Sequence, residues 1–259
     1  MIEVRNLYKS FDGREVLHDI SITFDDGKTN LIIGQSGSGK TVLMKNLVGL
    51  LTPTSGQVLY DGRDFVKMTK REKVMMRREM GMIFQSAALF DSLSVMENVM
   101  FPLDMFSTMS LRERRKRAME CLDRVNLVGA DKKFPAEISG GMQKRVAIAR
   151  AIALNPKYLF CDEPNSGLDP KTSLVIDELL SAITHDFAMT TIINTHDMNS
   201  VMGIGENILF IREGHKEWQG RSSEIMDSTC KPLTDFVFAS DLLKEMRSAV
   251  HTTHNAQMA

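Results

Sequence analysis

The chain has few cysteines, and they show none of the paired spacings that bind zinc. Its three cysteines, Cys121, Cys161 and Cys230, are scattered and odd in number. Zinc sites usually need closely spaced pairs of cysteine or histidine ligands. The sequence therefore predicts no cysteine-based zinc site, and scattered free thiols favour a reducing compartment.

Long apolar runs are also missing. No stretch approaches the roughly 18 uninterrupted apolar residues that indicate a membrane-spanning helix. Residues 1–7 alternate in polarity and carry a charge from the third residue, which is unlike the apolar core of a signal peptide. We predict an edge strand at residues 1–7, and we expect any membrane role to depend on a partner protein.

The chain has no excess of charge of either sign. Its 32 lysines and arginines nearly balance 33 aspartates and glutamates, for a formal net charge of -1. This balance gives no broad electrostatic case for a nucleic-acid partner. The basic runs at 77–78 and 112–117 might contact nucleic acid or lipid headgroups, but acidic residues interleave with them. We therefore interpret both runs as solvated helix faces.

What the sequence does contain is an alternation of strand-like and helix-like segments. In the first part of the chain we expect short strands with tight turns within 1–33, the last of them at 31–33, then a helix at 41–50 and a strand at 58–60. The middle portion is expected to be helical, with helices at 69–78 and 111–125, and Pro102 and Pro135 interrupt it. After it we expect helices at 141–154, 171–185 and 197–203, which alternate with strands at 158–161, 190–194 and 207–212. This alternation predicts an α/β fold with a mainly parallel sheet between helices. We expect one domain over residues 1–240 and a polar tail over residues 241–259.

A phosphate-binding pattern follows the strand expected at 31–33. It consists of Gly34, Gln35, Ser36, Gly37, Ser38, Gly39, Lys40 and Thr41, with Val42 next in the helix. The glycines let backbone N–H groups turn inward around phosphate oxygens, where a side chain would block the approach. Lys40 can reach the β- and γ-phosphates, and the Thr41 hydroxyl can bind Mg²⁺. The pattern and its flanks predict a P-loop that binds a nucleoside triphosphate.

Further polar residues follow other predicted strands. Asp162 and Glu163 end an apolar run: Asp162 can hold Mg²⁺ through water, and Glu163 can orient or deprotonate an attacking water. His196 follows the strand at 190–194 and can contact the γ-phosphate. Gln85 follows a strand-like run and can contribute to Mg²⁺ and the water. Because ligands gather at the carboxyl ends of parallel strands, we expect these residues in one site.

A second anion-binding segment precedes the helix expected at 141–154. Ser139, Gly140 and Gly141 can present a hydroxyl and bare backbone N–H groups at a helix start, which is an anion site. The chain already has one phosphate loop, so this segment makes most sense if it holds the nucleotide of a neighbouring copy. We therefore predict that one copy carries half of an active site and that two copies close over two nucleotides.

In this order, these residues resemble the nucleotide-binding subunit of ABC transporters, from about residue 2 to about residue 226. Residues 34–41 resemble the Walker A motif, Gln85 the Q-loop, residues 139–141 the signature, residues 158–163 the Walker B strand with its catalytic glutamate, residues 166–169 the D-loop with Asp169, and His196 the switch histidine. The resemblance implies a P-loop NTPase core with a small antiparallel β subdomain and a helical subdomain inserted at about 88–150.

The same resemblance implies ligands and partners. Phe11 lies where the family places an aromatic ring that stacks on adenine, and Val16 is nearby. ATP and Mg²⁺ are the implied cofactors, and the implied assembly is a homodimer bound to integral membrane permease subunits at the cytoplasmic face of the inner membrane. Leu89, Phe90 and Met96 follow the Q-loop, where the family docks a short helix of its permease.

Four segments narrow the resemblance. They are Phe-Gln-Ser-Ala-Ala-Leu-Phe at 84–90, Asn98-Val99, Pro102-Leu103 and Ser-Gly-Gly-Met-Gln-Lys-Arg at 139–145, and they look like ATPases of the Mla and Mce type, which energise phospholipid or sterol movement between membranes of the cell envelope. That likeness implies a permease like that of the Mla systems and a substrate-binding protein of the Mce type. The chain departs from the common family residues at Ile138, Met142, Asn165 and Gly167. None of these changes removes a phosphate ligand, so we expect ATP hydrolysis to persist.

Two other functions stay open. An importer ATPase for amino acids or another small polar solute has the same catalytic residues and differs in its permease. A soluble ABC ATPase of DNA repair or translation, or an ATP-binding scaffold, usually carries two cassettes or a long coiled-coil insertion, and this chain has one cassette. The apolar segment Phe236-Val237-Phe238 is expected to dock at a place that the sequence does not identify.

Overall fold

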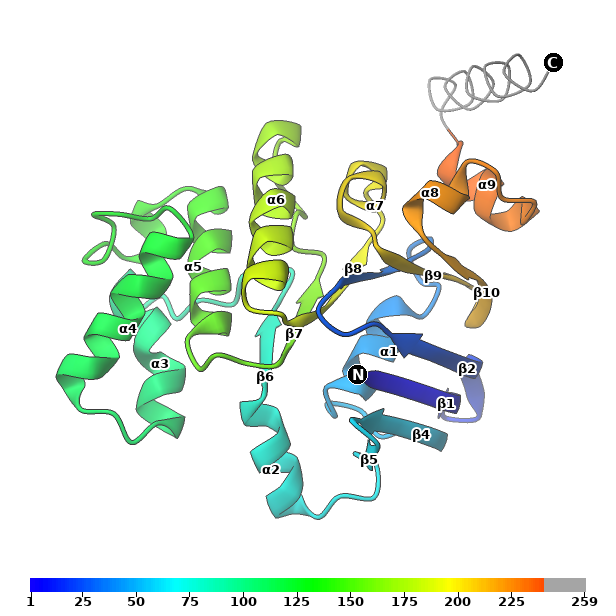
Figure 1. The fold of residues 1–259 in the computed structure, drawn as a ribbon, viewed down its shortest axis with the longest axis horizontal. Helices are drawn as coiled ribbons and strands as arrows, with labels where there is room; N and C mark the ends of the chain where they lie inside the picture. The colour runs from blue at the N-terminus through cyan, green and yellow to red at the C-terminus, as the bar shows by residue number, and fades with distance from the viewer. Residues whose placement is uncertain (240–259) are drawn as a thin grey trace.

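The computed structural model describes residues 1–239 as a ten-stranded sheet with helices packed against it (Figure 1). The predicted polar tail, residues 241–259, lies outside the described residues. The strands are β1 (Ile2–Phe11), β2 (Arg14–Phe24), β3 (Thr29–Ile33), β4 (Ser55–Tyr60), β5 (Arg63–Asp64), β6 (Met80–Ile83), β7 (Tyr158–Asp162), β8 (Thr190–Thr195), β9 (Asn207–Arg212) and β10 (His215–Gly220). The α-helices are α1 (Lys40–Leu47), α2 (Lys70–Arg78), α3 (Val95–Phe106), α4 (Leu111–Arg124), α5 (Gly140–Ile152), α6 (Pro170–Asp186), α7 (Met198–Ile204), α8 (Ser222–Ile225) and α9 (Lys231–Val237).

The sheet has a parallel and an antiparallel part. Its strand order is β5-β4-β1-β2-β10-β9-β3-β8-β7-β6. The strands from β9 to β6 run parallel to one another, whereas β1, β2, β4 and β5 pair antiparallel. A single residue pair, His18 with His215, joins β2 to β10 and so connects the two parts. The predicted α/β class, with a parallel core, an antiparallel part and inserted helices, is confirmed.

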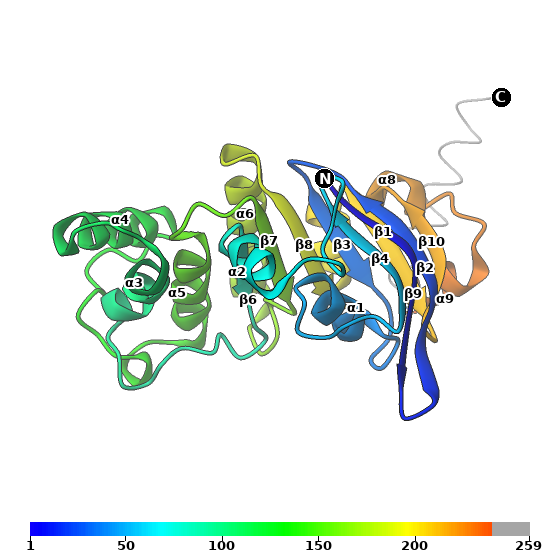
Figure 2. The same cartoon turned by 90° about the horizontal axis from the view of Figure 1, so that it is seen from below.

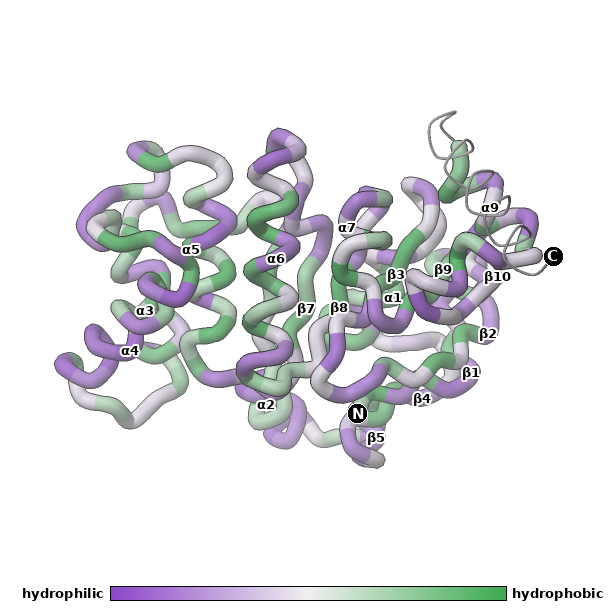
Figure 3. Tube along the Cα trace, turned by 45° about the horizontal axis from the view of Figure 1, so that its top comes forward, coloured by the Kyte–Doolittle hydropathy of each residue, from purple (hydrophilic) through white to green (hydrophobic). Residues whose placement is uncertain are grey.

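Both faces of the parallel part are buried, which explains its apolar strands. Successive side chains of a strand point to opposite faces, so Leu31 and Ile33 enter one hydrophobic core and Ile32 enters the other. The first core also contains side chains of helices α3 to α9, and the second contains those of α1, α2 and the antiparallel strands. Figure 3 shows hydrophobic stretches along β3 and β9 and hydrophilic ones along α4. Covering of this kind stabilises a parallel sheet.

Helices α3, α4 and α5 cluster at one end of the molecule, and the antiparallel strands lie toward the other end (Figures 1 and 2). Capping boxes begin two of these helices, with Ser94 and Glu97 at α3 and Ser110 and Glu113 at α4. Each box satisfies backbone N–H groups that the first helical turn leaves unpaired. This cluster corresponds to the insertion expected at about 88–150. Within residues 1–239, no helix is long and apolar enough to cross a membrane.

Some expectations about single elements were wrong. β1 is not an edge strand, because β2 pairs with one side of it and β4 with the other. Pro102 lies inside α3 and does not interrupt it; the buried neighbours Val99 and Leu103 hold the helix against the core although proline lacks an N–H donor. Strand β10 and helices α8 and α9 were not expected.

Candidate active site

Four parallel strands end side by side at one edge of the sheet, and a predicted site residue or loop follows each of them. β3, β8, β7 and β6 are consecutive neighbours, and the chain beyond them carries the P-loop, His196, Glu163 and Gln85. One pocket of about 700 Å³ is lined by Val16, Gln35, Ser36, Gly37, Gly39, Lys40, Thr41, Val42, Gln85, Glu163, His196 and Phe236. We call it the nucleotide pocket. The structure thus brings Gln85, Glu163 and His196 together with most of the P-loop.

The P-loop leaves β3 through a position that only glycine can occupy. Gly34 has a φ of 150°, and a Cβ atom built on it would lie 2.1 Å from the backbone oxygen of Ile211 in β9. A side chain there would push the loop away from its neighbouring strand. Gly34 therefore lets the loop turn directly off β3 while it stays packed on β9.

Lys40 is the first residue of α1, and its side chain lies inside the P-loop. Its ammonium donates hydrogen bonds to the carbonyl oxygens of Gly34 at 2.8 Å and Gln35 at 3.0 Å, and the residue is 5% exposed. Burial lowers the pKa of the Lys40 ammonium, while the carboxylates of Glu163 and Asp162 act in the opposite direction. The lysine is thus a buried cation at the centre of the loop, where phosphate charge needs a partner.

Thr41 and Asp162 bring two oxygen ligands together. The Thr41 hydroxyl donates to Asp162 Oδ1 at 3.3 Å, and Asn194 Nδ2 donates to the same oxygen at 3.0 Å. Hydroxyl and carboxylate oxygens suit Mg²⁺, so the donor set fits the predicted magnesium, and Thr41 and Asp162 are the residues that would hold it. Among the described residues, no group of three His, Cys, Asp or Glu side chains could hold a metal ion. Phosphate oxygens are needed to complete such a site.

Glu163 and His196 contact each other across the pocket. Glu163 Oε2 lies 2.8 Å from His196 Nδ1, and the two side chains are 18% and 64% exposed. The backbone of Glu163 is left-handed, with φ of 50°, and its N–H donates to the carbonyl of Asn194 at 3.0 Å. Strained backbone of this kind is held in place by its surroundings. The result is a largely buried carboxylate that can accept a proton, oriented by an imidazole ring at the mouth of the pocket.

Comparison with known proteins explains this arrangement. The family described as "ABC transporter" matches residues 17–166, which include the P-loop, Gln85, the segment at 139–141, Asp162 and Glu163. The chain belongs to the ABC transporter family. It is an ABC ATPase domain, a fold that binds ATP together with Mg²⁺.

Curated relatives of this ABC ATPase domain carry several names. A probable ribonucleotide transport ATP-binding protein, mkl, of Mycobacterium tuberculosis (strain ATCC 25618 / H37Rv) is 38% identical over 214 residues, which are 83% of this chain and 60% of the relative. The methionine import ATP-binding protein MetN of Carboxydothermus hydrogenoformans is 36% identical over 253 residues, 96% of this chain and 75% of the relative. The chain therefore spans only about 60% of the length of the mycobacterial relative.

Solved structures agree with the fold. The ATP-binding cassette MJ0796, solved as a dimer in a post-hydrolysis state bound to ADP and Pi, matches with a TM-score of 0.79 and 33% identity, over 86% of this chain and 99% of that chain. CbiO1 from Clostridium perfringens, part of the ABC transporter complex cbiONQ, matches with a TM-score of 0.82 and 29% identity, over 95% and 98% of the two chains.

In this ABC ATPase, Gln85 is held at both its backbone and its side chain. The ammonium of Lys144, on α5, donates to the Gln85 carbonyl, and Gln85 Nε2 donates to the Ser166 hydroxyl at 3.1 Å. Burial lowers the pKa of Lys144, and the charge of Glu163 opposes this effect. Gln85 thus links α5, the nucleotide pocket and the D-loop.

The chain beyond Gln85 takes an unusual conformation that α5 supports. Ala87 and Ala88 both have left-handed backbones, with φ of 62° and 47°. Alanine rarely adopts this region. The guanidinium of Arg150 donates to both carbonyl oxygens, each at 2.7 Å, and its burial lowers its pKa. Two bonds from one rigid group therefore hold the two alanines in place.

The signature and the D-loop lie next to each other, but they do not line the nucleotide pocket of the described chain. Ser139 caps α5 by accepting a hydrogen bond from the Met142 N–H at 3.3 Å. A Cβ atom on Gly141 would lie 2.8 Å from the Thr172 methyl carbon, and the Thr172 N–H in turn donates to Asp169 at 3.0 Å. None of Ser139, Gly140, Gly141 and Asp169 is among the residues that line the pocket.

Three other predicted nucleotide contacts, Phe11, Gly34 and Ser38, are not among the residues that line the pocket. Phe11, at the end of β1, is 40% exposed, and the Lys9 ammonium lies 4.7 Å from the centre of its ring. Ser38 instead lines a second pocket, which shares Gln35, Ser36 and Gly37 with the nucleotide pocket. Val16, the other predicted adenine contact, does line the nucleotide pocket.

The sequence did not predict three residues at this site, Asn194, Lys144 and Phe236. Asn194 and Lys144 act through hydrogen bonds to Asp162 and to Gln85. Phe236 reaches the pocket from α9. Its only sequence signal was the apolar triplet at 236–238, which indicated docking without indicating where.

Proposed function

We propose that this chain is the ATP-hydrolysing subunit of an ABC transporter. The observation that carries the proposal is the convergence of the P-loop, Asp162, Glu163 and His196 at one sheet edge. Lys40 and the loop N–H groups would bind the phosphates, and Thr41 and Asp162 would hold Mg²⁺, which would neutralise phosphate charge. Glu163 accepts a proton from the attacking water, and His196 orients Glu163.

We propose that two copies form the working unit. Ser139 and the glycines after it can bind an anion at the start of α5, yet they do not line the nucleotide pocket of their own chain. A second copy, turned head to tail, would bring its signature to the open side of this pocket. The solved dimer of the similar cassette MJ0796 supports this assembly.

Glu163→Gln tests the hydrolytic role. Glutamine has the shape of glutamate but cannot accept a proton, so we expect kcat to fall by about 100-fold or more while MgATP still binds. A dimer should then accumulate with MgATP and should be visible by light scattering after size-exclusion chromatography. Lys40→Ala is the control, because it should bind no MgATP and form no such dimer. A Glu163→Gln variant with normal phosphate release would refute the role.

We further propose that the cargo is phospholipid, moved across or between cell-envelope membranes through a separate permease on whose cytoplasmic face this subunit sits. The segments at 84–90 and 139–145, which resemble Mla- and Mce-type ATPases, contact each other through the hydrogen bond from Lys144 to the Gln85 carbonyl, and Arg150, farther along α5, donates to the carbonyls of Ala87 and Ala88. Beside them, Phe90 and Phe101 form an exposed ring pair with centroids 4.6 Å apart. This apolar pair supports docking of a permease helix next to the Q-loop.

The nearest rival is an importer of a small solute. It is favoured by the names of the relatives, which concern methionine import and ribonucleotide transport. Affinity purification of the chain from detergent-solubilised membranes separates the two. The lipid proposal predicts a co-purifying permease, an Mce-type protein and phospholipid above the level of an unrelated membrane-protein control. Phospholipid at the control level, with a solute-binding protein present, would favour the importer, and recovery without any membrane protein would favour a non-transport ATPase.

A further inference from the structure

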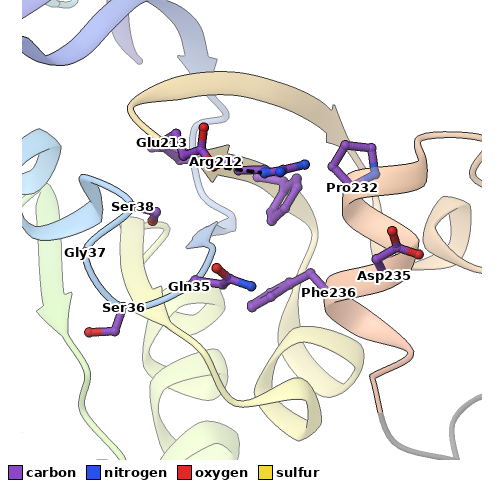
Figure 4. Close-up of a pocket in the computed structure, with 11 residues that line it drawn as sticks. Gln35, Ser36, Gly37, Ser38, Arg212, Glu213, Pro232, Asp235 and Phe236 are labelled. Carbon is purple, nitrogen blue, oxygen red and sulfur yellow. Dashed lines mark ion pairs between the residues drawn. The ribbon is translucent and has the colours of Figure 1, made fainter.

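Helix α9 lies beside residues 35–38 of the P-loop. A second pocket, of about 280 Å³, lies there; we call it the outer pocket, and it is lined by Gln35, Ser36, Gly37, Ser38, Phe210, Ile211, Arg212, Glu213, Pro232, Asp235 and Phe236. Figure 4 shows the side chains of Phe236 and Gln35 pointing toward each other across it. Phe236 also lines the nucleotide pocket. One aromatic ring therefore lines both pockets that border the phosphate-binding loop.

The ring of Phe236 is firmly held. It stacks on Phe210 in β9, with centroids 5.3 Å apart and an angle of 26° between the planes. Phe210 is buried and pairs in register with Ile33, the residue before Gly34. Val237, also buried, fixes the end of α9 to the core. Phe236 is thus connected through β9 to the strand from which the P-loop starts.

The P-loop needs support from outside. Gly34, Gly37 and Gly39 all have positive φ angles, and glycine loses more conformational freedom on ordering than any other residue. At the far end of the loop, the Gly214 N–H donates to the carbonyl of Ser38 at 3.0 Å. The Ser38 hydroxyl, which lines the outer pocket, is buried and has no hydrogen-bond partner in the part of the chain that the structure describes. At the near end, Gln35 to Gly37, Phe236 lines the outer pocket together with Phe210 and Ile211.

We propose that Phe236 is a positioning residue for nucleotide binding, and this proposal rests on the proposed ATP site. Its ring holds residues 35–37 from outside, so that the N–H groups of the loop are oriented before the phosphates arrive. Because the loop is already ordered, binding of the phosphates costs less conformational entropy. By linkage, nucleotide binding must then stabilise α9 by the same factor that α9 strengthens binding. Helix α9 therefore becomes more stable when the site is occupied, and in turn strengthens nucleotide binding.

Substitution of Phe236 tests the first half of this proposal. We expect Phe236→Ala to raise the Kd for MgADP and the KM for MgATP by about tenfold, with kcat changed by less than about twofold, because the phosphates bind more weakly and the chemistry is untouched. Phe236→Leu, which keeps an apolar side chain, should recover most of the affinity. Phe187→Ala is the matched control: Phe187 is an exposed ring, 41% accessible, that contacts Arg124. It should leave all three constants unchanged.

Hydrogen exchange tests the second half on the unmodified protein. MgADP should slow amide exchange at residues 231–237, and this protection should be lost in Phe236→Ala at saturating MgADP. Trp218, the single tryptophan of the chain, packs against the same core as Phe236 and should show a matching fluorescence change. If Phe236→Ala does not fold, Phe236→Leu and the wild-type exchange data decide.

The outcomes separate the two proposals. Unchanged MgADP affinity in a folded Phe236→Ala, or a wild-type protein that binds MgADP without protection at 231–237, would overturn the role of Phe236 alone. A wild-type protein that binds no MgADP would instead overturn the proposed ATP site.

Discussion

Asp61 shows how one side chain can join three distant parts of the chain. It lies in the turn between β4 and β5 with φ of 48°. Its carboxylate accepts hydrogen bonds from the N-terminal ammonium at 2.6 Å, from the Lys157 ammonium at 2.6 Å and from the Tyr158 hydroxyl at 2.7 Å. Partial burial raises the pKa of Asp61, but these three bonds outweigh burial and hold it well below its ordinary value of 3.8.

The lowered pKa of Asp61 predicts a pH-dependent contribution to stability. A carboxyl whose pKa is lowered by folding stabilises the fold above its ordinary pKa of 3.8, and this contribution is lost as the pH falls toward the folded-state value. Asparagine tolerates the left-handed turn, so Asp61→Asn removes mainly the charge. We expect it to lower the free energy of unfolding by about 1 kcal/mol near neutral pH, a modest figure because solvent screens this partly exposed group.

Urea unfolding at about pH 7 and about pH 3 checks this expectation. The difference in the free energy of unfolding between wild type and Asp61→Asn should be smaller at the lower pH. Glu213→Gln is the control. Glu213 is also left-handed, with φ of 49°, but its side chain is 80% exposed and its carboxylate lies 3.6 Å from Arg212. The Glu213→Gln variant should have the same free energy of unfolding as wild type at both pH values. An equal gap for Asp61→Asn at both values would contradict the argument.

At the scale of elements, the sequence predicted the segments that carry a strong local pattern. The strand expected at 158–161 is β7 at Tyr158–Asp162, and the helix expected at 171–185 is α6 at Pro170–Asp186. β7 is a run of buried apolar residues, and Asp169 caps α6. By contrast, β10 is a mostly exposed, polar strand, and it exists because β9 supplies its hydrogen bonds. No local pattern could have shown it.

The same distinction separates predicted from missed residues at the site. The P-loop and Glu163 were predictable because phosphate chemistry requires fixed residue types at fixed spacing beside a strand. Lys144, Asn194 and Phe236 act on residues far along the chain, such as Gln85 for Lys144. Contacts between distant segments leave no periodic pattern in the sequence. They depend on strand order and helix packing, which only the structure shows.

At the scale of the whole molecule, the P-loop and the signature lie in different parts of one chain. The P-loop follows β3, which lies between β9 and β8 in the interior of the sheet. Ser139, by contrast, caps the start of α5 in the helical cluster. If each site combines the P-loop of one copy with the signature of the other, defects in the two halves must complement each other when copies mix.

Mixing two inactive variants tests this arrangement. Lys40→Ala disables the P-loop, and Ser139→Arg, at an exposed position, blocks the signature. In an equal mixture about half of the dimers are mixed, and each mixed dimer keeps one intact site, so about a quarter of the wild-type ATPase rate should return. Lys40→Ala mixed with Glu163→Gln is the matched control and should recover nothing, because both defects fall on the same half. No recovery with Ser139→Arg would place the signature in its own chain's site.

The position of β3 also determines when during synthesis both edges of this strand can be paired. β3 ends at Ile33, but the strands on its two sides are β8 at Thr190–Thr195 and β9 at Asn207–Arg212. The β1–β2 hairpin can pair as soon as it leaves the ribosome, since its contacts are local. β3 is translated early, when neither of its edges has a strand to pair with, and it stays unpaired until almost the whole sheet has been translated. A truncated chain that ends before β9 therefore leaves at least one edge of this apolar strand unpaired and open to chaperones and proteases.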